Sequence, residues 1–389
     1  MASVPDTIVR TRTFRAYLSK SGHANLAAFL GQLTWLWNVA LNQRRQAYER
    51  DGSSVSRYDQ FKALTKTRQS ADDAWQRFPV GAQRSVLARL DKAFKAFFRR
   101  VKEGEKPGFP RYKQARGVRS FSMPSPKIHG NGEWSWVGIK GIGRIRFRGM
   151  PEGTVKLLRI VKTARRVNIQ FVCETPHDAK PDTRPAIGLD LGINARVALT
   201  TGERFPGVKV DRSELKRRQR KVSRADRGSR NRRKKVRTLA REWQRVRERE
   251  QGALHELTTR IVCEHGAWLA VEDLETRNMM RNPKLARRIA EQQWNRLVWM
   301  LSYKAESAGG RLVKVDPRHT SQDCSACGHR PRERIDLSVR VYRCKQCGHE
   351  QDRDVNAAHN ILQRAYGPNP AGASAGARGA TRAATAASV

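Results

Sequence analysis

The feature that most constrains this chain is a pair of cysteine knuckles near its C-terminal end. Cys324 and Cys327 form the first knuckle and Cys344 and Cys347 the second, which gives C-x2-C-x16-C-x2-C spacing. Four thiolates at this spacing predict a closed, structural zinc site. A glycine follows each knuckle and favours a tight turn, and the histidines after those glycines are expected at the surface. The remaining cysteines, at 173 and 263, are expected to pack as small hydrophobes in a reducing compartment.

The charge of the chain predicts a polyanionic partner. Its 389 residues contain 78 Lys and Arg against 36 Asp and Glu, a formal net charge of +42. Cationic side chains that neutralise phosphates release counterions, which drives binding to nucleic acid. No window approaches 18 consecutive apolar residues, and charged residues interrupt positions 1–18, so neither a spanning helix nor a signal peptide is expected. We therefore expect a cytoplasmic nucleic-acid protein with no membrane partner.

The hydrophobic pattern of the N-terminal half changes its period twice. Residues 8–18 alternate at period two, as in a strand, and period two returns in short strands between 118 and 175. Between them, helical spacing covers three stretches: about 22–50, 56–68 and 80–103. The simplest organisation is a small β-barrel, residues 1–20 and 114–180, split by an inserted helical lobe at 21–113.

A second domain is expected from residue 186, after a proline-rich linker at 176–185. Residues 186–200 are predicted to form one apolar strand, interrupted by Asp190. Residues 211–250 are predicted to form a basic helical hairpin that turns near Gly228. The remaining predicted elements are helices at 253–264, 284–308 and 355–366, and strands at 268–272 and 311–315. The tail, residues 367–389, is rich in Ala, Gly, Ser and Arg and is expected to be disordered.

Three carboxylates are candidates for metal-dependent chemistry. Asp190 lies inside a strand whose other residues are apolar, Glu272 ends an apolar strand, and Asp354 stands where the N-cap of a helix is expected. A buried carboxylate without a partner costs several kcal/mol. In so basic a chain, three such acids are best explained as a cluster that holds divalent cations. Two Mg²⁺ ions about 3.5–4 Å apart can generate a hydroxide and stabilise the leaving oxygen of a phosphodiester.

Each acid taken alone has a structural alternative. Asp190 could cap a turn between its flanking glycines, Glu272 could pair with an arginine of the basic hairpin, and Asp354 could be no more than a helix cap. Together, the order strand Asp, strand Glu, helix Asp matches an RNase H-like nuclease. The competitors for neighbouring roles are Asp352, Asp273 and Glu275. We favour Asp354 because the start of a helix would fix its position.

These segments together resemble TnpB, the RNA-guided nuclease family of bacterial insertion sequences, which is similar to the ancestors of type V CRISPR effectors. The resemblance covers residues 186–366 specifically and the upstream part more loosely. The motifs that carry it are Gly188–Ile193, Val271–Leu274, Tyr303–Ala305, Ser321–Gly328, Cys344–Gly348 and Asp352–Ala358, with looser matches at Trp37–Leu41, 86–98 and Gly108–Arg111.

The resemblance implies a multidomain α+β and α/β fold. A wedge-type β-barrel with an inserted helical recognition lobe would hold a non-coding guide RNA and read a short motif beside double-stranded target DNA. A RuvC-like domain, residues 186–320 and 351–366, would cut the DNA with Mg²⁺, and a zinc ribbon, residues 321–350, would be inserted in it. The protein would act at the bacterial nucleoid, as a monomer per RNA.

The same resemblance assigns roles to the candidate residues. Asp190, Glu272 and Asp354 match the three catalytic acids of the family and its Mg²⁺ ligands. The four knuckle cysteines match its zinc ligands. Because the three acids are all present, the resemblance favours an active nuclease over nuclease-silent relatives that repress transcription.

Contacts to nucleic acid are expected on basic residues, because a guide-dependent enzyme needs backbone contacts more than base readout. The hairpin at 211–250 is a candidate wall for the heteroduplex or a single strand, and a solvated charged face is the alternative. The candidate contacts are Tyr58, Gln83 and Arg84 in the helical lobe, and Arg217, Arg218, Lys234 and Lys235 in the hairpin.

Two other classes of function stay open. A catalytically silent zinc-ribbon protein that binds RNA or DNA, such as a guide-directed repressor, would bind tightly without cutting. A guide-independent nuclease, like a junction resolvase or RNase H, would cut branched DNA or hybrids without a bound RNA. The large basic N-terminal half disfavours the latter, because a resolvase needs little beyond residues 186–366.

Overall fold

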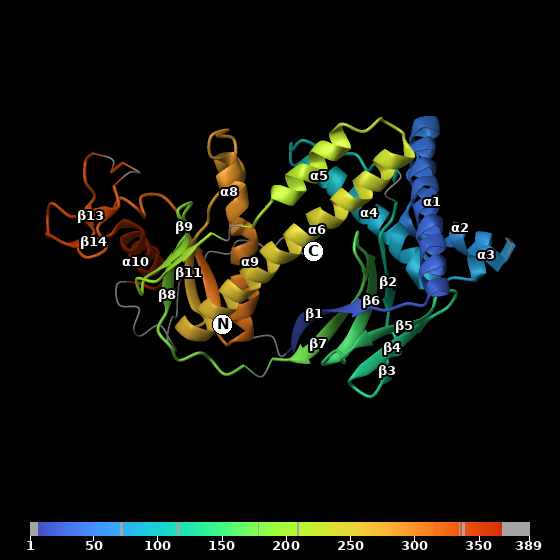
Figure 1. The fold of residues 1–389 in the computed structure, drawn as a ribbon, viewed down its shortest axis with the longest axis horizontal. Helices are drawn as coiled ribbons and strands as arrows, with labels where there is room; N and C mark the ends of the chain where they lie inside the picture. The colour runs from blue at the N-terminus through green and yellow to red at the C-terminus, as the bar shows by residue number, and fades with distance from the viewer. Residues whose placement is uncertain are drawn as a thin grey trace. The chain divides into compact units, whose positions relative to one another are not determined.

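The computed structural model describes residues 7–70, 73–114, 117–177, 179–207, 210–333, 335–336 and 339–367 (Figure 1). Its fold mixes helices with several β-sheets. The chain divides into two compact units, Met1–His177 and Asp178–Val389. Within the described ranges, no helix has the length and apolar character needed to cross a membrane.

The helices of the first unit confirm the three predicted helical stretches. They are α1 (Lys20–Asp51), α2 (Arg57–Ser70), α3 (Asp73–Gln76) and α4 (Val80–Lys102). Ser19 caps α1 by accepting a hydrogen bond from the Gly22 backbone N–H at 3.0 Å. The helix ends at Gly52, whose positive φ of 70° suits a residue without a side chain. The apolar stripes of α1 and α4, including Leu33 and Leu90, are buried in one core.

The strands of the first unit form two antiparallel sheets. The sheet orders are β1–β7–β6–β2 and β3–β4–β5. The strands are β1 (Thr7–Ala16), β2 (Ser120–Pro124), β3 (His129–Gly130), β4 (Trp134–Ile139), β5 (Gly143–Arg148), β6 (Thr154–Lys162) and β7 (Val167–Pro176). A bridge between Tyr17 and Arg146 links the sheets. The Phe147 ring lies 5.3 Å from Phe14 and 5.1 Å from Phe171, so aromatic packing fills their core. Closure into a wedge-type barrel stays a prediction.

The second unit is built on one mixed sheet of order β10–β9–β8–β11–β12 (Figure 1). Its strands are β8 (Ile187–Asp190), β9 (Ala195–Leu199), β10 (Arg204–Pro206), β11 (Trp268–Glu272) and β12 (Arg311–Val315). The prediction of one strand over 186–200 was wrong, because β8 and β9 are antiparallel partners with Leu189 opposite Leu199. The chain reverses after β8 at Gly192, where a Cβ would come 2.7 Å from the Ala195 carbonyl oxygen.

The helices of the second unit correct two further predictions. They are α5 (Ser213–Ser223), α6 (Arg230–Arg260), the π-helical turn η1 (Ile261–His265), α7 (Thr276–Met279), α8 (Ala286–Gln292), α9 (Trp294–Ser307) and α10 (Arg353–Tyr366). The predicted hairpin is confirmed, with Gly228 at φ 86° before the N-cap Ser229. The predicted helix at 253–264 is not separate, because α6 continues unbroken into η1. The predicted helix at 284–308 is broken at Gln293, whose φ of 52° separates α8 from α9.

Alternation along β11 decides which residues face each layer of helices. Leu269 and Val271 are buried with residues of α6 and α9. Ala270 points the other way and packs with Ile361 of α10. Successive side chains of a strand point to opposite faces, so every second residue shares a layer. The position of an acid at the end of a strand therefore fixes the helix that it faces.

Candidate functional site

Two of the predicted acids lie at the carboxyl ends of neighbouring strands, and this end of the sheet is called the acid edge. β8 ends at Asp190 and β11 ends at Glu272, and these strands are parallel neighbours with Leu189 opposite Val271. Their carboxyl ends therefore lie side by side. Asp190 shares a strand face with Gly188, which lies so close to α10 that a Cβ would come 2.0 Å from the Ala358 carbonyl oxygen. Glycine is thus needed to bring α10, and with it the third acid, against this edge.

The third acid lies in the first turn of α10. The sequence predicted Asp354 as the N-cap, but the structure corrects this: Asp352 is the cap, and its Oδ1 accepts hydrogen bonds from the backbone N–H groups of Asp354 (2.9 Å) and Val355 (3.2 Å). Capping by the earlier residue leaves the Asp354 carboxylate free for other partners. Its side chain is 18% exposed, one turn before the residue that contacts Gly188.

Burial raises the pKa of both strand acids. Burial raises the pKa of Asp190 well above its ordinary value, and the nearby charges of Glu272 and Asp354 raise it further. Burial also raises the pKa of Glu272, although its carboxylate accepts a hydrogen bond from the Thr320 hydroxyl. The three acids therefore interact electrostatically. Grouped carboxyls of this kind are typical of functional sites rather than of packing.

Arg204 of β10 forms ion pairs at the start of α10, beside this edge. Its Nη1 lies 2.7 Å from Asp352 Oδ2 and its Nη2 lies 2.7 Å from Asp354 Oδ2. The sequence analysis did not find this residue, because nothing in a strand pattern marks one arginine among many. The hydrogen bonds tie the sheet edge to the start of α10.

The donor set of the acid edge fits a hard divalent cation. Asp190, Glu272 and Asp354 offer only carboxylate oxygens, which are the ligands that Mg²⁺ prefers. Burial raises the pKa of two of them, so a bound cation would offset the cost of keeping their carboxylates ionised. In the part of the chain that the structure describes, the three carboxylates do not all approach one another within 4.8 Å.

The four knuckle cysteines form a second cluster, and its geometry suits zinc. Cys324 Sγ lies 3.7 Å from Cys347 Sγ, Cys327 Sγ lies 3.7 Å from Cys344 Sγ, and all four sulfurs lie within 4.8 Å of one another. Four Zn–S bonds of about 2.3 Å in a tetrahedron place the sulfurs about 3.8 Å apart. A hydrogen bond from the Cys347 backbone N–H lowers the pKa of Cys344 to about 6, whereas burial raises the pKa of Cys324.

The two knuckles have the same turn. The Gly328 N–H donates to the Cys324 carbonyl at 2.9 Å, and the Gly348 N–H donates to the Cys344 carbonyl at 3.0 Å. Both glycines have φ near 74°, a conformation that a side chain disfavours. The two histidines after these glycines are not among the clustered ligands in the described residues. The second knuckle lies between strands β13 (Val341–Arg343) and β14 (Glu350–Asp352), which pair antiparallel.

A buried polar stripe of α10 attaches the first knuckle to the sheet. Asn356 accepts a hydrogen bond from the Ser325 N–H at 2.9 Å and donates to the Asp323 carbonyl at 2.8 Å. Asn360, one turn later, donates to the Thr320 carbonyl at 2.8 Å and to the Asp323 carbonyl at 2.7 Å. The sequence analysis missed both asparagines. The available signal was two amides four residues apart on an otherwise apolar helix face.

A third group has metal-like spacing but is already neutralised. Glu203, Glu264 and His265 place one ligand atom each within 4.8 Å of the others. Arg260 lies between the two carboxylates, 2.6 Å from Glu203 Oε1 and 2.9 Å from Glu264 Oε2. Because Arg260 pairs with both carboxylates, we interpret this group as an ion-pair cluster.

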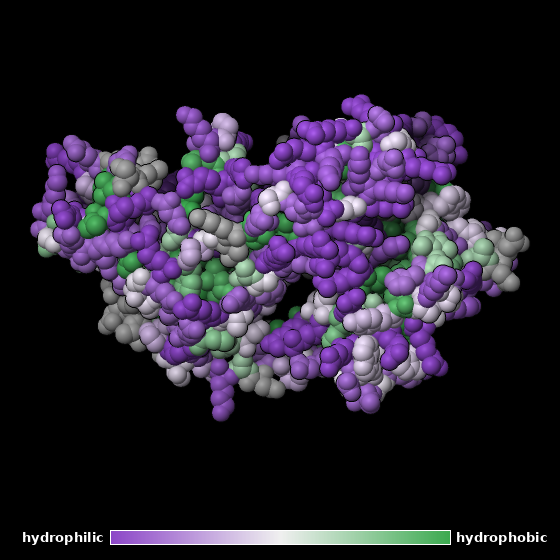
Figure 2. Space-filling model, in the orientation of Figure 1, coloured by the Kyte–Doolittle hydropathy of each residue, from purple (hydrophilic) through white to green (hydrophobic). Residues whose placement is uncertain are grey.

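Some cations of the basic hairpin form ion pairs within it, and others are exposed. Arg217 and Arg218, which the sequence analysis chose as nucleic-acid contacts, both pair with Glu214, at 2.6 Å and 2.7 Å. Lys234 and Lys235 are exposed on α6. Figure 2 shows hydrophilic side chains over most of the visible face of α5 and α6.

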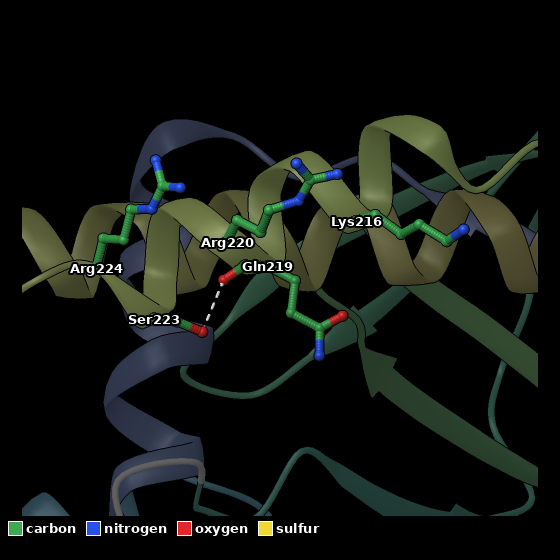
Figure 3. A pocket seen from close by; sticks show the side chains of 5 residues that line it. All are labelled: Lys216, Gln219, Arg220, Ser223 and Arg224. Atoms are coloured by element: carbon green, nitrogen blue, oxygen red, sulfur yellow. Dashed lines mark hydrogen bonds between the residues drawn. The ribbon is translucent and has the colours of Figure 1, made fainter.

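A second stripe of α5 was missed by the sequence analysis. Lys216, Arg220 and Arg224, with Gln219 and Ser223, line a pocket of about 320 Å³. Figure 3 shows these side chains extending from consecutive turns of the helix. Their spacing of four residues puts the three cations on one face. Because the described residues offer these cations no ion pair, they are better candidates for phosphate contacts than Arg217 and Arg218.

The candidate contacts in the helical lobe differ in exposure. Tyr58 is exposed, and the guanidinium of Arg57 lies over its ring. Arg84 is exposed and lies over Phe61. Gln83 is 0% exposed, and its amide is hydrogen-bonded to Arg68 at 2.8 Å. Its predicted role as a nucleic-acid contact therefore does not agree with the structure, because its side chain is part of the core of the first unit.

Two family models match the chain, almost entirely within the second unit. Residues 170–283 match the IS605 OrfB family, described as "Probable transposase". Residues 294–361 match the family described as "Cas12f1-like, TNB domain". The first match contains Asp190 and Glu272, and the second contains the four knuckle cysteines and Asp354.

Curated relatives align with almost the whole chain. A protein of Streptomyces pristinaespiralis named "Putative RNA-guided DNA endonuclease" is 34% identical over 365 residues, which is 91% of this chain and 89% of the relative. The InsQ protein of Escherichia coli (strain K12), which carries the same name, is 27% identical over 378 residues, 91% of this chain and 92% of the relative.

A solved structure has a similar fold. The protein in a cryo-EM structure titled as the Cas12f1-sgRNA-target DNA complex matches with a TM-score of 0.53 and 12% identity, covering 92% of this chain and 99% of that chain. At this identity the likeness concerns the fold alone. The near full-length match at 34% identity is decisive, and this chain belongs to the TnpB family of proteins.

Proposed function

We propose that this protein is an RNA-guided DNA endonuclease. The observation that supports the proposal is that Asp190 and Glu272 end neighbouring parallel strands and that the charge of Asp354 acts on Asp190, in a chain that belongs to the TnpB family. A non-coding RNA bound by the protein would select the DNA, and a short motif beside the target would license its recognition. The protein would act in the bacterial cytoplasm as a monomer per RNA.

The three acids would hold Mg²⁺, and the bound ions would activate water and stabilise the leaving oxygen of a phosphodiester. Asp190 and Glu272 would hold it from the sheet, where burial keeps their carboxyl groups out of bulk water. Thr320 would orient the Glu272 carboxylate through its hydrogen bond. Asp354 would complete the set from α10, once Arg204 releases its carboxylate.

The cysteines would hold a structural Zn²⁺. The bound ion would stabilise the zinc ribbon, residues 321–350, which Asn356 and Asn360 of α10 hold by hydrogen bonds around the first knuckle. Because Asp354 lies at the start of the same helix, zinc would also stabilise the position of a catalytic acid. The zinc ribbon would then be inserted in a RuvC-like domain of residues 186–320 and 351–366, and the tail predicted to be disordered, 367–389, lies outside the described residues beyond Gly367.

The first unit and the basic hairpin would bind the nucleic acids. A wedge-type barrel of residues 1–20 and 114–180, with its helical lobe at 21–113, would hold the guide RNA. The unpaired cations of α5 and the exposed Lys234 and Lys235 would contact phosphates without reading sequence. Tyr58 and Arg84 are exposed and stay candidates for the duplex beside the target.

The test begins with the RNA that copurifies with the full-length protein. Sequencing it should reveal one discrete non-coding RNA, and a DNA that matches its guide should be cut in Mg²⁺ beside a short motif. Asp190→Ala should abolish cutting while the amount of bound RNA stays the same. Asp226→Ala, in the turn of the hairpin, is the matched control and should cut normally.

Other outcomes would favour the alternative functions. Cutting of branched DNA by RNA-free protein at an undiminished rate would refute the guide requirement. Tight, salt-sensitive binding with no cleavage by the wild type would instead favour a guide-directed repressor.

A further inference from the structure

A pocket beside the acid edge has no role in the chemistry described above. It has a volume of about 330 Å³ and lies between the carboxyl ends of the strands and helix α9. Its lining includes Leu191, Glu272, Val298, Trp299, Leu312 and Lys314. This size falls at the lower end of the range for ligand pockets, about 300–1,000 Å³. The pocket therefore suits a small planar group better than a folded element.

The indole of Trp299 is exposed, unlike the other large apolar side chains of α9 that form the core. Helix α9 buries Trp294 and Leu301 in the core of the second unit, whereas Trp299 is 63% exposed. Its ring lies 5.0 Å from Tyr303 at an interplanar angle of 59°, so its orientation is supported from one side while its other surface stays open. An open aromatic face that lines a pocket is the arrangement on which unpaired bases stack.

The polar rim of the pocket suits a nucleotide. Lys314 Nζ pairs with Asp273 Oδ1 at 2.9 Å, and both side chains are more than half exposed, so the pair is weak and Lys314 can turn to a phosphate. Glu272 also lines the pocket. A base stacked on Trp299 would thus have its sugar and phosphate near Glu272, one of the acids that would hold Mg²⁺.

We infer that this pocket holds one unpaired base of the single-stranded DNA that is cut, with Trp299 as the stacking surface. The inference rests on the proposed function and deepens it, because it states that the strand enters the acid edge unpaired. Stacking does not depend on base identity, which agrees with sequence selection by a guide. The pocket would position the phosphate that follows the base.

The experiment is photo-crosslinking of the full-length RNA-bound protein to single-stranded DNA that carries 5-iodouracil. It is done without Mg²⁺, so that no cutting occurs, and at about 0.3 M salt, where phosphate contacts weaken steeply. Mass spectrometry of the digested adduct should locate the crosslink on Trp299 or Tyr303. Trp299→Ala should lower the affinity for the DNA roughly 5- to 100-fold, the value expected for one stacked base. Trp299→Phe should restore most of it.

Met280→Ala is the control, because Met280 is also an exposed apolar side chain of the second unit but lies outside the pocket lining and the basic hairpin. It should leave affinity and adduct unchanged. Adducts confined to other residues, together with a Trp299→Ala affinity within twofold of the wild type, would overturn the inference. Cutting by Asp190→Ala protein would instead overturn the proposed function, and the crosslinking result does not depend on that measurement.

Discussion

The guanidinium of Arg204 lies 2.7 Å from the Asp354 carboxylate, and its other nitrogen lies 2.7 Å from Asp352. One residue of an edge strand thus neutralises two acids at the start of α10. The same carboxylate of Asp354 raises the pKa of Asp190. Arg204 therefore competes with any divalent cation for a ligand of the proposed metal site.

Replacement of Arg204 should strengthen cation binding. Arg204→Gln removes the competing charge, so the dissociation constant for Mn²⁺, measured by isothermal titration calorimetry, should fall about 3- to 10-fold, the size expected for a partly exposed charge-assisted hydrogen bond. Arg204→Lys should behave like the wild type. Arg217→Gln, whose partner is Glu214 on α5, is the control and should change nothing. Weaker Mn²⁺ binding by Arg204→Gln would show that Arg204 supports the site instead of competing for it.

Asp190 should make the metal-free protein less stable as pH rises. Burial raises the pKa of Asp190 in the folded protein. The stability that this shift contributes is fully present below the unfolded pKa of about 3.9, and it is lost as pH rises through the folded pKa. Asp190→Asn should reduce this dependence and raise the metal-free Tm above pH 6, by about 2–4 °C for each kcal/mol gained. Thermal unfolding from pH 4 to 8 in EDTA measures it, with Asp226→Asn as the control. An unchanged pH profile would contradict the burial of a carboxyl group at this position.

Loss of a knuckle cysteine should release zinc and loosen the C-terminal part of the second unit. Wild-type protein should contain one zinc per chain by elemental analysis, and Cys344→Ser should contain much less. Hydrogen exchange should then increase over both knuckles and at the start of α10, because Asn356 and Asn360 connect them. Cys263→Ser, at an exposed cysteine outside the cluster, should keep its zinc. Well-folded wild-type protein without zinc would refute the assignment.

The contact between Gly188 and α10 should not tolerate a methyl group. A Cβ at this position would come 2.0 Å from the Ala358 carbonyl oxygen, which is backbone and cannot move aside cheaply. Gly188→Ala should therefore reduce the free energy of unfolding by about 1–3 kcal/mol, measured with urea. Gly252→Ala, inside α6 with nothing within 4 Å of the new Cβ, should instead stabilise the protein by about 0.5–1 kcal/mol. Equal stability of the two variants would contradict the close packing of α10.

Much of the local structure could be predicted because local rules decide it. The helices α1, α2 and α4 followed from 3.6-residue spacing, and the turn of the basic hairpin followed from Gly228. Cysteine spacing likewise predicted a cluster whose sulfurs now lie 3.7 Å apart in pairs. Failures came where tertiary contacts override the local pattern: the reversal after β8, the break at Gln293, and the continuation of α6 into η1.

The sequence by itself determined which residues could carry the chemistry, because carboxylates in apolar strands and paired thiols cost free energy unless they bind a partner. Only the tertiary structure decided how they meet. Parallel pairing of β8 with β11 places Asp190 beside Glu272, and Gly188 brings α10 close. Arg204 and the pocket at Trp299 were invisible in the sequence, because exposure and through-space pairing depend on neighbours far along the chain, which no periodicity encodes.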